Sequence, residues 1–246
     1  MIKLIKYELR KQAFSKGIIL AILGLLELLF LYGIIRDNNM AFSLSIALLV
    51  FVTYVAILYV AFENIFAFSG ELNSKRSYML FLIPRSSYEI VGAKVIAAGI
   101  QILITGFTFL LVAILDIGII TARYDMFARM KEMLVNFMAE ITKTDINIKM
   151  ILLVFLTLLL SWICTMTIGF FSITLSTTFL ANKKLNRLIS FVIFMGITIL
   201  QSYIANKLFG IDISQSYNIY LSLYTICFIA LTYLGTSWML DKKVCV

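Results

Sequence analysis

Two carboxylates, Glu27 and Glu63, lie inside long apolar stretches of the sequence. An acidic side chain at the middle of a membrane costs about 2.5–3.5 kcal/mol on insertion scales, so each is expected to face other helices or a partner. Two interpretations of Glu27 are open: it contacts a substrate or a proton, or it forms a hydrogen bond between helices. Glu63 lies toward the cytoplasmic end of its stretch, where nearby water favours a structural role.

Small and polar residues form two stripes at helical spacing. Residues three or four apart share one face of a helix, and the stripes are Gln101, Thr105 and Thr108, and Ser161, Thr165, Gly169, Ser172 and Ser176. Small residues let helix backbones approach closely, and hydroxyl groups form hydrogen bonds between helices. The stripes are interpreted either as helix-packing faces or as the lining of a polar translocation route that also includes the two carboxylates.

Enzymatic chemistry is not expected of this chain. It contains no histidine and no Gly-x-x-x-x-Gly-Lys-Ser/Thr motif, so it offers neither a nucleophile–base pair nor a P-loop for ATP. The three cysteines, Cys164, Cys227 and Cys245, form no Cys-x-x-Cys motif, and the sequence has no metal-ligand cluster. We therefore predict no catalytic residue, no metal and no cofactor bound by the chain itself.

Six long apolar stretches must position these polar residues. Hydrophobic residues make up 62% of the 246 residues, above the roughly 45–50% of globular proteins. A helix of about 20 apolar residues crosses a hydrocarbon core of about 30 Å and satisfies its own backbone groups. The sequence therefore predicts an all-α polytopic membrane protein, a single transmembrane domain over residues 1–246 with six transmembrane helices. The predicted spans are residues 17–35, 40–68, 95–115, 150–181, 188–205 and 217–240.

Basic residues predict the orientation of these spans. With the N-terminus inside, six spans return the C-terminus to the cytoplasm, and twice as many of the 21 lysines and arginines lie inside as outside. The positive-inside rule thus indicates a multi-pass protein of the cell membrane with both termini cytoplasmic. The net charge of +8 is expected to meet anionic headgroups of the lipid bilayer and not nucleic acid. Residues 1–16 are predicted to form an amphipathic interfacial helix, because apolar residues recur there at helical spacing between basic ones.

The predicted cytoplasmic loop at residues 70–94 contains the chain's one proline, Pro84. Because proline disfavours helix at the residue before it, a short helix over residues 74–82 should end there, and Ser86 or Ser87 should cap the next helix. The loop would be a compact segment with an aromatic tip and basic edges, formed by Lys75, Arg76, Tyr78, Met79, Phe81, Leu82, Pro84 and Arg85. Residues 116–149 are predicted to be extracellular, with an amphipathic helix over 124–141.

The order of these elements resembles the membrane subunit of a type-2 ABC exporter. Residues 5–11, IKYELRK, are similar to that family's N-terminal connecting helix. Residues 75–94 are similar to its coupling segment, in which a short helix, a proline and a lysine before the third span recur. The chain departs from the family at residues 206–216, where a brief stretch stands in place of short re-entrant helices.

The resemblance implies a half-transporter without its own ATPase site. Two six-span permease subunits, identical or different, would pair around a central route. Each would bind a separate cytoplasmic ABC ATPase subunit, which carries ATP-Mg, through the coupling segment. The expected function is export of an amphiphile, lipid or peptide across the cytoplasmic membrane. The alternatives are an ion-coupled secondary transporter that uses Glu27 and Glu63, and a non-transporting membrane protein with an immunity or sensor role.

Overall fold

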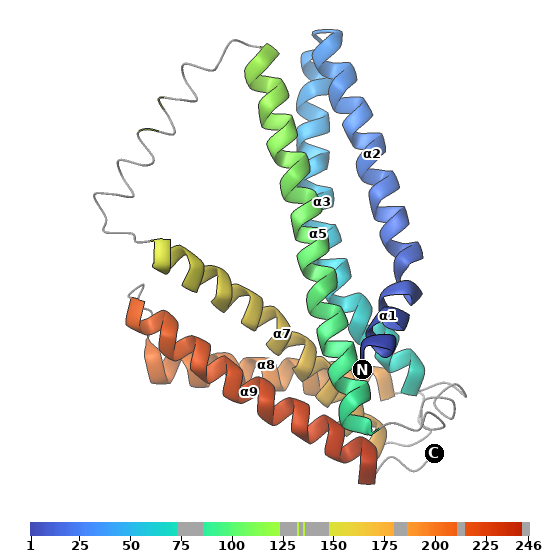
Figure 1. Ribbon diagram of the computed structural model, residues 1–246, viewed down its shortest axis with the longest axis vertical. Helices are drawn as coiled ribbons and strands as arrows, with labels where there is room; N and C mark the ends of the chain where they lie inside the picture. The colour runs from blue at the N-terminus through green and yellow to red at the C-terminus, as the bar shows by residue number, and fades with distance from the viewer. Residues whose placement is uncertain are drawn as a thin grey trace. The chain divides into compact units, whose positions relative to one another are not determined.

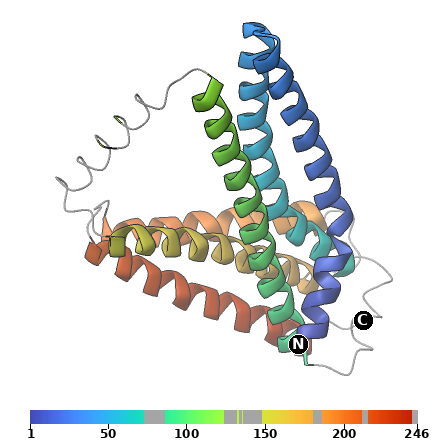
Figure 2. The ribbon, with the colours of Figure 1, turned by 45° about the horizontal axis from the view of Figure 1, so that its top comes forward.

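The computed structural model describes residues 1–72, 86–123, 132, 135, 148–179, 186–210 and 215–242. All regular structure in these ranges is helical (Figure 1, Figure 2). The helices there are α1 (Ile2–Lys11), α2 (Ala13–Ile35), α3 (Asn39–Leu72), α5 (Ser87–Arg123), α7 (Ile148–Phe179), α8 (Asn186–Phe209) and α9 (Gln215–Lys242). The predicted helix over 124–141 falls outside the described residues, apart from Glu132 and Val135.

Every one of these helices except α1 is long and apolar enough to cross a membrane. The prediction of an all-helical chain with six candidate spans is confirmed, and the chain is a multi-pass membrane protein. Helices α3 and α5 extend beyond the predicted spans 40–68 and 95–115 at both ends. Residues 116–123, predicted as the start of the outer segment, form the last part of α5. Helix α1 ends at Lys11, earlier than the interfacial helix predicted over 1–16.

The chain divides into two compact units, and the boundaries between them fall inside α1, α3 and α5 and after the first residue of α7. The first unit consists of Met1–Glu8, Ala61–Ile100 and Lys149–Val246. The second consists of Leu9–Val60 and Gln101–Ile148. Helices α1, α3 and α5 therefore contribute to both. We call the first the α7–α9 unit and the second the α2 unit.

In the α2 unit, α2 packs against the first part of α3 and the second part of α5. Their core is formed by buried apolar side chains: Leu23, Phe30, Ile34, Leu49, Ala56 and Phe109. Phe30 is completely enclosed, and its ring lies 5.8 Å from that of Phe42 across the α2–α3 contact. This close packing depends on how tightly the chain turns between the two helices.

The turn that joins α2 to α3 is three residues long. Asp37 adopts a φ of 50°, in the left-handed region where aspartate and asparagine are the favoured non-glycine residues. Asn38 then caps α3, because its Oδ1 accepts hydrogen bonds from the backbone N–H groups of Met40 and Ala41 at 3.1 and 3.2 Å. The turn brings Gly33 directly against the backbone of α3.

In the α7–α9 unit, the three C-terminal helices run side by side (Figure 1, Figure 2). The Thr232 hydroxyl of α9 donates to the Thr167 hydroxyl of α7 at 3.0 Å. The Tyr224 hydroxyl of α9 donates to the Gln201 carbonyl of α8, also at 3.0 Å. A core of buried apolar residues from α3, α5, α7 and α9 joins them to the rest of the unit: Phe68, Val91, Phe170, Ile173 and Leu240. Hydroxyl contacts and apolar packing together hold this unit.

Gly33→Ala should destabilise the protein. The added Cβ would lie 2.7 Å from the backbone nitrogen of Phe42 and 2.8 Å from its Cα, and these atoms can move only if α3 moves. We expect a loss of about 1–3 kcal/mol, the usual cost of overpacking, measured as a lower midpoint of thermal unfolding in detergent. Gly24→Ala in the same helix is the matched control, because nothing lies within 4 Å of its added Cβ. Equal midpoints for the two variants would contradict the close contact between α2 and α3.

Candidate functional site

The predicted ATPase-coupling residues lie outside the described part of the chain. These are Lys75, Arg76, Tyr78, Met79, Phe81, Leu82, Pro84 and Arg85. The structure describes the residues on either side of them, from the end of α3 at Leu72 and from Ser86 onward. The candidate site is therefore built from the two helices that flank residues 73–85.

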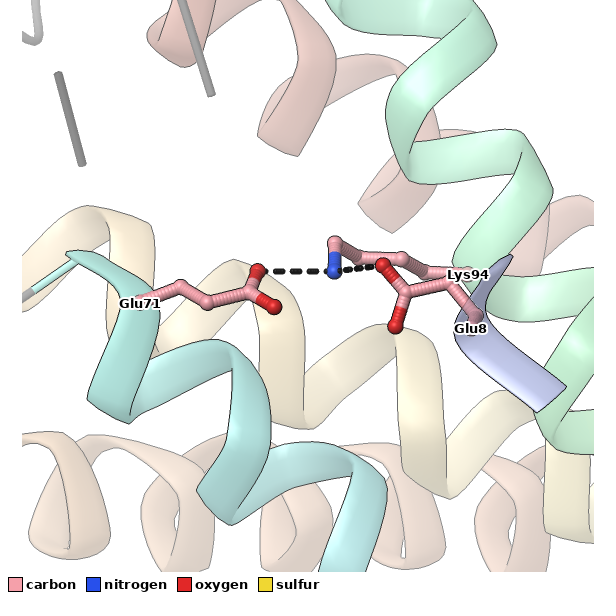
Figure 3. A network of polar contacts seen from close by, with 3 residues as sticks. All are labelled: Glu8, Glu71 and Lys94. Carbon is pink, nitrogen blue, oxygen red and sulfur yellow. Dashed lines mark hydrogen bonds and ion pairs between the residues drawn. The ribbon is translucent and has the colours of Figure 1, made fainter. Parts of the chain in front are cut away.

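A lysine on α5 lies between two carboxylates from α1 and α3 (Figure 3). Lys94 Nζ is 2.5 Å from Glu8 Oε1, as a hydrogen-bonded ion pair, and 2.7 Å from Glu71 Oε2, as an ion pair. The side chains of Lys94, Glu8 and Glu71 are only 6%, 12% and 14% exposed. The ammonium also lies 5.9 Å from the centroid of the Phe68 ring, within the range of a cation–π interaction. We call Glu8, Glu71 and Lys94 the charged triad.

Burial makes the members of the charged triad depend on one another, and on Lys94 most of all. A buried charge is tolerated when an opposite charge pairs with it. Removing one partner of a buried ion pair lowers the free energy of unfolding by far more than an exposed ion pair contributes to it. Two carboxylates here face a single ammonium, so Lys94 is the member whose loss would leave the most uncompensated charge. Loss of either glutamate would still leave Lys94 with one partner.

The start of α5 is fixed to α9 as well as to the charged triad. The Ser87 hydroxyl donates to Asp241 Oδ1 at 3.4 Å, and the Tyr233 hydroxyl donates to the Tyr88 carbonyl at 2.8 Å. Ser86 caps the helix, since its Oγ accepts a hydrogen bond from the backbone N–H of Glu89 at 3.3 Å. The predicted cap at Ser86 or Ser87, with Glu89 in the first turn, is thus confirmed. The start of α5, directly after residues 73–85, is therefore held in place by hydrogen bonds.

Sequence reasoning missed the charged triad. Lys94 was interpreted as one of many basic residues on the inner side, and Glu8 as part of an amphipathic helix. One signal was available: Glu8 is the only acidic residue among positions 1–16. Because Glu8 and Lys94 are separated by 86 positions, their pairing follows from the packing of α1 against α5 and not from any local pattern.

Glu27 contacts a second carboxyl group in the α2 unit. Its side chain lies close enough to that of Asp116 of α5 for the two carboxyl groups to interact electrostatically. Two neighbouring carboxylates repel each other when both are ionised, which favours a single proton on the pair. The sequence assigned Asp116 to the outer segment 116–149, so this partner was not foreseen. Glu63 is half-buried on α3, in the other unit.

The predicted stripe on α5 lines one cavity. Gln101 is buried, Thr105 and Thr108 are half-buried, and all three line a cavity of about 340 Å³ in the α2 unit. Lys16 lines the same cavity from α2, together with apolar residues. The helical spacing therefore identified a shared face correctly. Its role as part of a translocation route stays a prediction.

The stripe on α7 changes character along the helix. Ser161 is exposed and Thr165 half-buried, and their hydroxyls donate to carbonyls of the preceding turn. Ser172 and Ser176 are buried. Ser176 donates to both the carbonyl and the side-chain oxygen of Asn186 on α8. Helix packing accounts for Ser176, whereas Ser172 lines a groove beside α3 and α8.

Metal binding finds no support in the described ranges. No three or more His, Cys, Asp or Glu side chains are grouped there so that they could hold a metal ion. Cys164 and Cys227 are free thiols.

Lys94→Met should destabilise the protein strongly. It removes the ammonium that forms buried ion pairs with Glu8 and Glu71, and breaking such a pair commonly costs about 3–5 kcal/mol. The expected result is a clearly lower midpoint of thermal unfolding in detergent. Adding Glu8→Gln and Glu71→Gln to Lys94→Met should recover much of the loss, because the buried charges are then gone. Lys207→Met, at an exposed lysine in the last turn of α8, is the control. A Lys94→Met variant as stable as this control would refute the triad.

The chain was compared with protein-family models, with curated proteins and with solved structures. None of the three comparisons found a match. A functional proposal for this membrane protein therefore depends on its residues and their geometry.

Proposed function

We propose that this chain is the permease subunit of an ATP-driven exporter. It would move an amphiphile, lipid or peptide across the cytoplasmic membrane, with energy from a separate ABC ATPase subunit, and would pair with a second permease subunit. The observation that carries the proposal is the charged triad, which joins α1 to both helices that flank the predicted coupling segment. An energy-coupled transporter needs such a connection between its cytoplasmic contact and its spans.

The lengths of the flanking helices support this role. Helix α3 has 34 residues and α5 has 37, or about 50 and 55 Å at 1.5 Å per residue. A hydrocarbon core of about 30 Å accounts for little more than half of either length. Both helices can therefore extend beyond the lipid and carry the segment between them. A force applied to residues 73–85 would pass directly into two spans.

The charged triad would prevent α3 from sliding along α5 when such a force is applied. Glu71 lies one residue before the end of α3, and Lys94 lies in the second turn of α5. If α3 slid along α5, the buried ammonium would lose one of its carboxylates, which is energetically costly. The two helices would therefore move together with α1. The three helices would thus transmit a movement of residues 73–85 as one rigid element.

A second candidate function is ion-coupled transport. It is favoured by the proximity of Glu27 and Asp116, because two neighbouring carboxyl groups on two candidate spans can bind one titratable proton between them. Ionisable side chains within spans commonly mark proton relays in pumps and transporters. In this alternative the pair would bind and release a proton during transport, and no ATPase would be needed.

The double change Tyr78→Ala with Phe81→Ala should release the ATPase when the complex is purified in detergent. These residues form the predicted aromatic tip, and truncating a buried interface aromatic commonly costs about 2 kcal/mol or more. The matched control is Phe51→Ala with Tyr54→Ala, an aromatic pair of the same spacing that is exposed on a candidate span. Retention of the ATPase at wild-type stoichiometry by the Tyr78 and Phe81 variant would refute the coupling role of this segment.

Glu27→Gln should separate the two candidate functions. Glutamine keeps hydrogen-bonding capacity but has no carboxyl group that can bind and release a proton. If the ATPase drives export, ATP hydrolysis by the co-purified complex and export from proteoliposomes should both stay at the wild-type level. If a proton gradient drives transport, export should fall about tenfold or more while surface expression is unchanged, as expected for loss of a group essential to coupling. Asp116→Asn should behave in the same way as Glu27→Gln.

A further inference from the structure

A groove of about 520 Å³ lies in the α7–α9 unit, bordered by α3, α7 and α8. Four phenylalanines line it, Phe62 and Phe66 from α3 and Phe191 and Phe194 from α8. Arg187, in the first turn of α8, lines the same groove. This volume is within the range of small-molecule sites, roughly 300–1,000 Å³. None of the proposed transport residues except Ser172 belongs to it.

Polarity changes along both helices that line the groove with phenylalanines. On α8 the lining residues run from Arg187 and Ser190 to Phe191 and Phe194, and on α3 they run from Phe62 and Phe66 to Ser69. Phe194 is seven residues from Arg187 along α8, or about 10 Å along the helix axis. Each of the two helices thus runs from a polar end to an aromatic end within a single groove. An occupant that fits must be an amphiphile with its polar group beside Arg187.

The charge of the groove specifies the sign of that polar group. Among the described residues that line it, Arg187 is the one charged side chain, and no carboxylate is present. Guanidinium binds phosphate oxygens through two parallel hydrogen bonds, which makes arginine better suited than lysine to this contact. The positive end of the α8 dipole lies at the same place. A phosphate group would find both charge and hydrogen-bond donors here.

We propose that this groove is a binding site for an anionic phospholipid. Its headgroup phosphate pairs with Arg187, and an acyl chain lies between the phenylalanines of α3 and α8. The site holds its lipid whether or not the chain works with an ATPase, so the inference does not depend on the proposed exporter function. A lipid bilayer supplies this ligand at high local concentration.

The test uses the full chain in nanodiscs that contain equal amounts of phosphatidylglycerol and phosphatidylcholine with identical acyl chains. Native mass spectrometry of the released protein counts each lipid that stays bound. Wild type should retain phosphatidylglycerol preferentially, and Arg187→Gln should reduce that preference about fivefold, as expected for one basic residue at an anionic membrane surface. Lys207→Gln, at the other end of α8, is the matched control and should keep the preference.

A second variant tests the aromatic wall separately. Phe66→Ser with Phe191→Ser should lower retention of both lipids, while the remaining preference for phosphatidylglycerol is unchanged. Equal retention of the two lipids by wild type would overturn the proposal. So would an Arg187→Gln variant with wild-type preference. A lipid-free dimer that dissociates on Arg187→Gln would place a second copy of the chain in the groove, and would overturn it as well.

Discussion

The ammonium of Lys94 can stay out of water only while a carboxylate lies beside it, and its two carboxylates come from two other helices. Attraction between buried charges repays their desolvation only when the geometry is good. The positions of α1, the end of α3 and the start of α5 are therefore set by a single contact. Two hydrogen bonds between α5 and α9, one donated by Ser87 and one accepted by the Tyr88 carbonyl, add a second constraint on α5. Residues 73–85 consequently connect two helix ends that cannot move independently.

Lipid is the reason why the helices were predictable and the charged triad was not. A span must be apolar and helical over its whole width, so the six stretches could be recognised from hydrophobicity alone. Beyond the lipid that constraint ends, and polar helical turns such as those at Glu71 and Ser87 carry no such pattern. The extra length of α3 and α5 was missed for this reason. Asp116 was missed in the same way, because a charged residue after an apolar run was interpreted as the end of the span.

The polar residues of the spans show how hydroxyl groups are accommodated in lipid. On α7, Ser161 and Thr165 donate to carbonyls of their own helix, so they need no partner from another span. Ser176 and Thr167 instead form contacts with α8 and α9. The spacing of such residues predicts which face they share, as the stripe on α5 demonstrates. It does not distinguish a packing face from a transport route, because both need small polar side chains in the same register.

The short turn between α2 and α3 bears on how the protein is made. Asn38 satisfies backbone N–H groups of α3 without a residue from any other helix, so the turn between α2 and α3 needs no later span for these hydrogen bonds. In the predicted orientation, this hairpin moves just one basic and one acidic residue, Arg36 and Asp37, across the hydrocarbon. Residues 124–147 carry seven charged side chains, and each must be transferred when that segment crosses. In this orientation, the first two spans can insert during translation with few charged residues to transfer. Residues 124–147 are the part of the chain whose transfer depends most on the insertion machinery.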